Sequence, residues 1–210
     1  MRRSQTGPRA RNLDAVYPPA WVWEFPFRSD RLCLDFVSTL GSRRTLKLER
    51  LKAPSDLKRW AREAGMGELQ RASTTELARA LQLREAIHAL VAAEALKQPA
   101  SIAVLNRAAA HPPLVPQLDQ AGDSSTWLPS ASVDQVLSTI ARDAIDLQSG
   151  SLRTRVKECA GIDCTILFLD TSRPGTRRWC SMEVCGNQLK SASLRAKRQA
   201  ARSRRAKPRS

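Results

Sequence analysis

The chain has 210 residues, of which 42% are hydrophobic, and a formal net charge of +15 at pH 7. This length suits one domain with a substantial core plus one small module, and no apolar run approaches the ~20 residues that a membrane-spanning helix needs. The basic amino terminus lacks the apolar stretch of a secretory signal, so we expect a cytoplasmic protein without membrane partners.

Near the amino terminus, aromatic residues occur at every second position, as Trp21, Trp23, Phe25 and Phe27. This alternation predicts a strand with one buried face, and Pro26 places that strand at the edge of a sheet. The row could line a pocket for a planar ligand. Sealing of the core is the simpler interpretation, because aromatic side chains bury large areas wherever they occur.

A compact apolar segment, residues 32–40, contains the carboxylate of Asp35 and the thiol of Cys33. We expect Cys33 to be a small buried side chain. An unpaired buried carboxylate is costly, so Asp35 either faces solvent or has a partner inside the protein. Arg43 or Arg44 could supply that partner, and binding of a small cationic ligand is the alternative.

Three amphipathic helices are predicted by apolar residues at intervals of three and four. The first has Ser55 as its N-cap and ends at Gly65. The second and third begin at Ser73 and Ser132, each followed three residues later by Glu or Gln in a capping box. Between them, residues 98–131 contain six Pro or Gly residues, which predicts a long irregular connection with one short helix.

Positive charge is concentrated in the carboxy-terminal part of the chain. Residues 151–210 carry fifteen Lys or Arg against four Asp or Glu, whereas residues 32–150 carry fourteen against thirteen. Such a field favours a polyanionic partner, although a solvated tail that aids solubility is the alternative. The change in charge coincides with a Ser-Gly break at 149–150. We therefore expect four parts, namely a flexible basic arm at 1–17, a mostly helical domain with a small β element at 18–150, a small module at 151–198 and a basic tail at 199–210.

The small module contains four of the five cysteines, as the pairs Cys159/Cys164 and Cys180/Cys185. Each pair has four residues between its members, and fifteen residues separate the pairs. Four thiolates suit one tetrahedral zinc ion and leave no open position for chemistry, so the predicted site is structural. Disulfide pairing and buried unliganded thiols are the alternatives, and both fit matched pairs in a reducing compartment less well.

The spacer between the cysteine pairs predicts a β-hairpin, with a strand at 165–169, a turn at 172–175 and a return at 177–179. Gly186 and Asn187 follow the last cysteine, where a helix could begin. A cysteine pair, a hairpin and a second cysteine pair at the start of a helix form a treble-clef-like zinc finger.

Two stretches of sequence resemble known families. RRWCSMEVCGN, preceded by the first cysteine pair, resembles the CGNR zinc finger. RLCLDFVSTLGSR, followed by APSDLKRWAREAGM, resembles the ABATE domain that accompanies this finger in bacterial stress-response transcription regulators. The two resemblances cover roughly residues 21–198 and imply a zinc-dependent regulator of transcription. Gln188 stands where the family has its name-giving arginine, which leaves one positive charge fewer at the helix start.

These features predict a DNA-binding transcription regulator, and an RNA-binding accessory protein is the alternative. The candidates for phosphate contact are Arg177, Arg178, Lys190, Arg195, Lys197 and Arg198. Asn187 and Gln188 are the candidates for base contact, because amides pair bidentately with adenine. We expect the helical domain to sense a small-molecule effector or to form a homodimer. The sequence offers no nucleophile-base motif, so we do not expect an enzyme.

Overall fold

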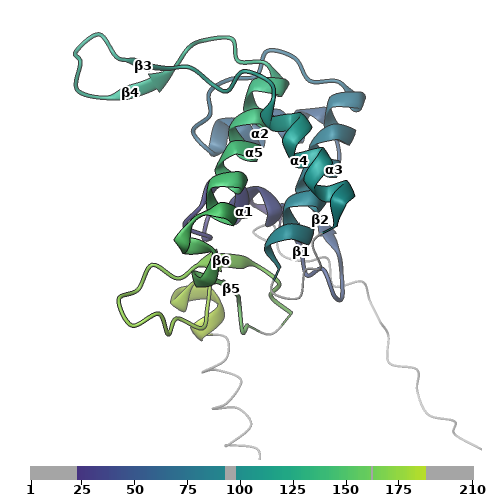
Figure 1. The fold of residues 1–210 in the computed structure, drawn as a ribbon, viewed down its shortest axis with the longest axis vertical. Helices are drawn as coiled ribbons and strands as arrows, with labels where there is room; N and C mark the ends of the chain where they lie inside the picture. The colour runs from purple at the N-terminus through teal and green to yellow at the C-terminus, as the bar shows by residue number, and fades with distance from the viewer. Residues whose placement is uncertain (1–22, 93–97, 162, 188–210) are drawn as a thin grey trace, which may run out of the picture.

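The computed structural model describes residues 23–92, 98–161 and 163–187. Within these ranges the protein is mainly helical, with three short antiparallel strand pairs (Figure 1). In chain order the elements are α1 (Leu32–Val37), β1 (Leu40–Gly41), β2 (Leu48–Glu49), α2 (Pro54–Glu63), α3 (Thr74–Val91), α4 (Pro99–Ala109), β3 (Pro116–Leu118), β4 (Ser125–Trp127), α5 (Val133–Ser149), the 3-10 helix η2 (Ser151–Arg155), β5 (Val156–Glu158), β6 (Leu167–Leu169) and the π-helical turn η3 (Met182–Gly186).

The two predicted capping boxes begin the two long helices. Ser73 Oγ accepts the Glu76 N–H at 3.2 Å at the start of α3, and Ser132 does the same for Gln135 at the start of α5. Helix α2 starts earlier than predicted. Its N-cap is Ala53 rather than Ser55, and the proline that follows is pre-organised for the first turn of a helix.

One hydrophobic core joins the helices α1 to α5. The ring of Phe36 on α1 meets the ring of Trp60 on α2 edge-on, with centroids 4.9 Å apart, and both side chains are fully buried. Arg31, just before α1, forms an ion pair with Asp143 on α5 at 2.8 Å. Cys33 is completely buried, as predicted, and its N–H donates to the same Asp143 carboxylate.

The predicted strand of alternating aromatic residues is wrong for its described part, because residues 23–28 belong to no strand. Phe25 is buried while Phe27 is 40% exposed. Arg59 on α2 covers this stretch, with its guanidinium 4.1 Å from the centre of the Phe25 ring. The alternation therefore reflects packing against α2 rather than strand pairing. Trp21 and the predicted arm at 1–17 lie outside the described residues.

The connection between α3 and α5 is more regular than predicted. It contains α4 and then the β3–β4 hairpin, which extends away from the helices in Figure 1. Pro116 pairs with Trp127 in this hairpin, and Trp127 Nε1 donates to the carbonyl oxygen of Gly65 at 2.7 Å. Frequent Pro and Gly residues hide such short strands from a sequence-based assignment.

A hairpin is present in the cysteine-rich module, but its strands are not those predicted. β6 pairs with β5, which precedes the first cysteine, in the register Val156↔Leu169 and Glu158↔Leu167. The loop between these strands carries the first cysteine pair. The return segment at 177–179 forms no strand and is held by other contacts.

Among the helices in the described ranges, none has the length and hydropathy needed to cross a bilayer.

Candidate metal centre and nucleic-acid interface

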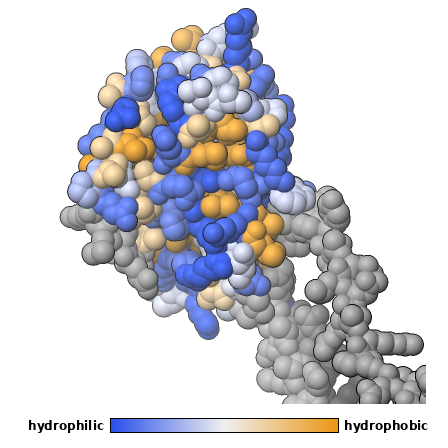
Figure 2. Space-filling model, turned by 90° about the vertical axis from the view of Figure 1, so that its right-hand side faces the viewer, coloured by the Kyte–Doolittle hydropathy of each residue, from blue (hydrophilic) through white to orange (hydrophobic). Residues whose placement is uncertain are grey.

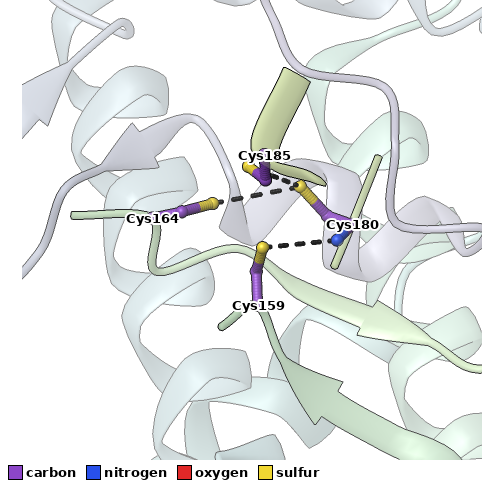
Figure 3. A group of neighbouring side chains, drawn as sticks. All are labelled: Cys159, Cys164, Cys180 and Cys185. Carbon is purple, nitrogen blue, oxygen red and sulfur yellow. Dashed lines mark hydrogen bonds between the residues drawn. The ribbon is translucent and has the colours of Figure 1, made fainter. Parts of the chain in front are cut away.

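The four predicted cysteine ligands come together at one point of the fold (Figure 3). Cys159 follows β5 and Cys164 lies in the loop before β6, so the hairpin brings this pair together. Cys185 lies in η3, five residues after Cys180. The four sulfur atoms all lie within 4.8 Å of one another.

The spacing of the sulfur atoms fits a tetrahedral zinc ion. Zinc binds thiolates at about 2.3 Å, so four sulfurs around one ion lie about 3.8 Å from one another. The Cys164 and Cys180 sulfurs are 3.9 Å apart, and the Cys180 and Cys185 sulfurs are 3.7 Å apart. These four residues hold one structural zinc ion, which supplies cross-linking rather than an open catalytic position.

Backbone groups around the cysteines stabilise negative charge on sulfur. The N–H groups of Cys180 and Gly161 both donate to Cys159 Sγ, at 3.3 and 3.4 Å. A thiolate is the form that binds zinc, so these contacts favour metal binding.

Gly161 is a part of this centre that the cysteine spacing did not predict. A Cβ atom at this position would lie 3.0 Å from Cys185 Sγ and 3.1 Å from the Cys164 Cβ. A side chain at residue 161 would therefore press against both cysteine pairs, which would have to move apart by a few tenths of an ångström. The signal available in the sequence is a glycine between two ligands of one pair.

A small apolar cluster surrounds the metal centre. Cys159, Cys180 and Cys185 are buried with Ile166 and Phe168, and Phe168 is completely buried. This cluster is too small to be a domain core by itself, so the metal cross-link is needed for its stability.

Asp170 organises the loop that leads to the second cysteine pair, a role that the sequence pattern did not predict. Its buried carboxylate accepts hydrogen bonds from Lys157 Nζ at 2.7 Å, the Ser172 N–H at 3.1 Å and the Arg177 N–H at 2.9 Å. These partners, Lys157 first, hold the pKa of Asp170 well below its usual range. A carboxylate directly after an apolar strand was the available signal.

The nucleic-acid-binding candidates fall into three structural settings. Arg177 makes internal contacts, since its Nε donates to the Trp179 carbonyl oxygen at 2.9 Å and its guanidinium lies 4.7 Å from the Phe168 ring centre. Arg178 and Asn187 are exposed. The remaining candidates lie outside the described residues, and they are Gln188, Lys190, Arg195, Lys197 and Arg198.

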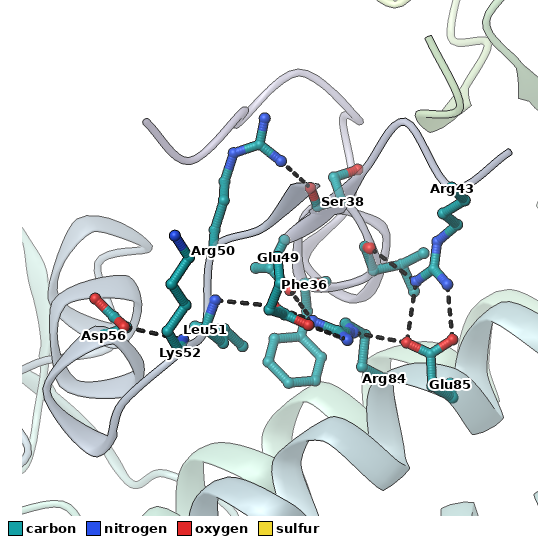
Figure 4. Close-up of polar contacts among 12 residues, drawn as sticks. Phe36, Ser38, Arg43, Glu49, Arg50, Leu51, Lys52, Asp56, Arg84 and Glu85 are labelled. Atoms are coloured by element: carbon teal, nitrogen blue, oxygen red, sulfur yellow. Dashed lines mark hydrogen bonds and ion pairs between the residues drawn. The ribbon is translucent and has the colours of Figure 1, made fainter. Parts of the chain in front are cut away.

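The predicted partners of Asp35 are wrong. Arg43 pairs with Glu85 at 2.7 Å, and Arg44 pairs with Glu158 at 2.7 Å (Figure 4 shows the first pair). Asp35 Oδ1 instead accepts the backbone N–H groups of Arg28 and Ser29, both at 3.0 Å. Nearby backbone donors satisfy the carboxylate, so it needs no arginine.

Several contacts join the metal-binding module to the helical body. Leu167 and Leu169 of β6 are buried in the same core as the helices. The Leu169 N–H donates to the Ser29 carbonyl oxygen at 2.8 Å, and the Arg177 guanidinium pairs with Asp30. The module is therefore packed into the body through β6 and is not connected to it by the chain alone.

The fold and the metal centre define a helical protein with a carboxy-terminal four-cysteine zinc finger. Residues 155–198 match the family model of the CGNR zinc finger. Residues 30–151 match the ABATE family model, described as "Putative stress-induced transcription regulator", and this match covers more than half of the chain. The chain therefore belongs to the ABATE family. No curated protein matches it significantly.

Proposed function

We propose that this protein is a DNA-binding transcription regulator whose four-cysteine zinc finger is the nucleic-acid-binding module. The observation that carries this proposal is the net charge of +11 over residues 151–210, on the finger and the chain that follows it. Each phosphate that a basic residue neutralises releases condensed counterions, which favours binding to a polyanion. Membership of a family described as regulating transcription supports the choice of DNA.

Within this proposal the residues of the finger have different roles. Exposed Arg178 and Asn187 flank the second cysteine pair in the sequence and are available to a partner. Arg177 holds the loop before Cys180, because its guanidinium bonds to the carbonyl oxygen of that cysteine. The basic residues after Asn187 then provide phosphate contacts, which position the finger but carry no sequence information.

The helical domain is, in this proposal, a sensing or dimerising half that acts without catalysing a reaction. Residues 32–150 carry a net charge of only +1, which suits a part that does not contact nucleic acid. We place the protein in the cytoplasm of a bacterium, where a DNA regulator has access to its targets.

RNA binding is the second candidate function, because a basic zinc module suits structured RNA as well as duplex DNA. A competition experiment separates the two. Labelled duplex DNA is bound by the zinc-loaded protein at moderate salt and then challenged with unlabelled duplex DNA or tRNA of equal phosphate concentration. Stronger displacement by duplex DNA supports the proposal, and stronger displacement by tRNA favours the RNA-binding function.

A further inference from the structure

A small cavity opens where α3, α4 and α5 meet, far along the chain from the zinc ligands. Its volume is about 70 Å³. The apolar part of its wall comes from Leu83 on α3, Val104 and Ala108 on α4, and Leu137 on α5. Leu83 and Leu137 are also members of the main core, so the floor of this cavity is held rigidly by the packed helices.

The cavity adjoins an open groove between α3 and α4. The groove has a volume of about 810 Å³ and shares Gln82, Val104 and Arg107 with the cavity. Figure 2 shows the side of the molecule that lies at the right in Figure 1, where hydrophobic residues form separate patches among hydrophilic ones. The groove lining includes Leu81, Ala86, Ala89 and Ala100.

Among the described residues of this surface, the cation of Arg107 forms no ion pair, although the Asp134 carboxylate lines the same cavity. Asp134 at the cavity is paired with Arg79 at 2.6 Å, and Glu85 at the groove is paired with Arg43 at 2.7 Å. The side chain of Arg107 lines both spaces and is exposed. Within the described part of the chain it makes no hydrogen bond or ion pair. Its guanidinium is therefore available to an anionic ligand.

The size of the enclosed space limits the apolar part of such a ligand. An engineered apolar cavity of roughly 150 Å³ holds benzene, so a cavity of about half that size suits the end of an alkyl chain rather than a ring. A guanidinium forms two parallel hydrogen bonds with a carboxylate, so a carboxylate matches Arg107 in both charge and geometry.

We propose that this cavity and groove form a binding site for a small alkyl carboxylate, whose tail enters the cavity and whose carboxylate pairs with Arg107. The site rests on the sensing role proposed for the helical domain and names the chemical class of its ligand. It is independent of the proposed DNA binding, because binding of the acid can be measured without nucleic acid.

Hexanoate is a suitable probe, and hexan-1-ol is its uncharged counterpart. Binding is followed in the full-length zinc-loaded protein by calorimetry and by backbone amide NMR shifts. We expect saturable binding of hexanoate with shifts at α3, α4 and α5, and weaker binding of hexan-1-ol. Arg107→Gln should weaken hexanoate binding by about tenfold, as removal of a charged hydrogen bond implies.

Two further variants complete the experiment. Arg71→Gln removes another exposed arginine, one that does not line the cavity, so hexanoate should bind this variant as it binds the wild type. Ala108→Leu fills the cavity and should block the probe.

Two results would overturn the proposal. One is that hexanoate and hexan-1-ol bind equally well and that Arg107→Gln leaves their binding unchanged. The other is the absence of saturable binding to the wild type. Arg107 is exposed, so its variant remains informative even if Ala108→Leu does not fold.

Discussion

Asp35 shows how a single half-buried carboxylate can make stability depend on pH. Burial raises its pKa from 3.8 to about 6, against the effect of the backbone N–H of Ser29. The folded protein therefore keeps a proton on Asp35 at pH values where the unfolded chain has released it. The stabilising contribution is complete below about pH 4 and is lost as the pH rises through about 6.

The variant Asp35→Asn tests this assignment, because an amide keeps the acceptor oxygen but cannot titrate. Between pH 4 and pH 7 the wild type should lose up to about 3 kcal/mol of unfolding free energy relative to the variant. Urea denaturation across this range measures the difference. The comparison is needed because His88, whose pKa is lowered to about 4 by burial and by Arg43, changes stability in the opposite sense. Parallel pH profiles would contradict the assignment.

Asp170 provides a second prediction at the scale of one residue. Asp170→Asn should weaken the hydrogen bonds that residue 170 accepts from Lys157 Nζ and from the Arg177 N–H. The loop that leads to Cys180 would then be less firmly positioned. Residues that orient metal ligands in this way typically contribute roughly 10- to 100-fold to metal affinity, so zinc binding should weaken by that order. Competition with a chromogenic chelator measures the affinity. The exposed Asp123→Asn is the matched control, and equal zinc affinity in both variants would contradict the role of Asp170.

At the scale of elements, two serines near helix starts distinguish a true cap from an apparent one. Ser73 caps α3, so Ser73→Ala should lower the unfolding free energy by about 1 kcal/mol. Ser55 lies inside the first turn of α2, where alanine is at least as favourable. Ser55→Ala should therefore leave stability unchanged or raise it slightly. Chemical denaturation of both variants tests the pair, and equal destabilisation would contradict Ala53 as the N-cap of α2.

Elements also differ in how well the sequence predicts them. The long helices α3 and α5 could be predicted because capping boxes and apolar periodicity agree along their whole length. The hairpin β3–β4 could not, because strands of three residues contain too few alternations to form a pattern. The partner of β6 could not be predicted either. Pairing with β5 leaves the first cysteine pair in the connecting loop, and spacing alone does not show which neighbour a strand takes.

The metal site could be predicted from the sequence although the strand pairing around it could not. Ligand type and spacing identify a four-thiolate centre without knowledge of the path of the chain between the ligands. The supporting residues were not predictable, since Gly161, Asp170 and Arg177 act through contacts that only the folded chain creates. Arg177 in particular is a surface cation by sequence and a bridge between loop, ring and Asp30 in the structure.

At the scale of the whole molecule, the finger and the helical domain should be energetically coupled. The sequence predicts a separate small module at 151–198, but Leu167 and Leu169 of this module lie in the main core. Leu169→Ala should destabilise the helical domain by about 2–5 kcal/mol while the four zinc ligands stay intact. Hydrogen exchange at α1 and α5, together with zinc content, measures both effects. Unchanged exchange in the helices would show that the finger is an independent module.

The basic tail should contribute affinity without sequence recognition. It lies outside the described residues, and its five cations are Arg202, Arg204, Arg205, Lys207 and Arg209. Deletion of residues 199–210 should reduce the slope of log affinity against log salt by up to ~0.9 for each phosphate that the tail neutralises. Nucleic-acid binding measured over a salt series gives this slope. An unchanged slope would exclude the tail from the interface.

Site-specific DNA binding by the zinc-loaded finger is the central claim, and selection from a genomic DNA fragment library across a salt series tests it most directly. We predict that discrete sequences remain enriched near physiological salt, because contacts to base edges survive when phosphate contacts are screened. Uniform binding that disappears as salt rises would contradict the claim, since it would leave a basic zinc module with electrostatic affinity alone.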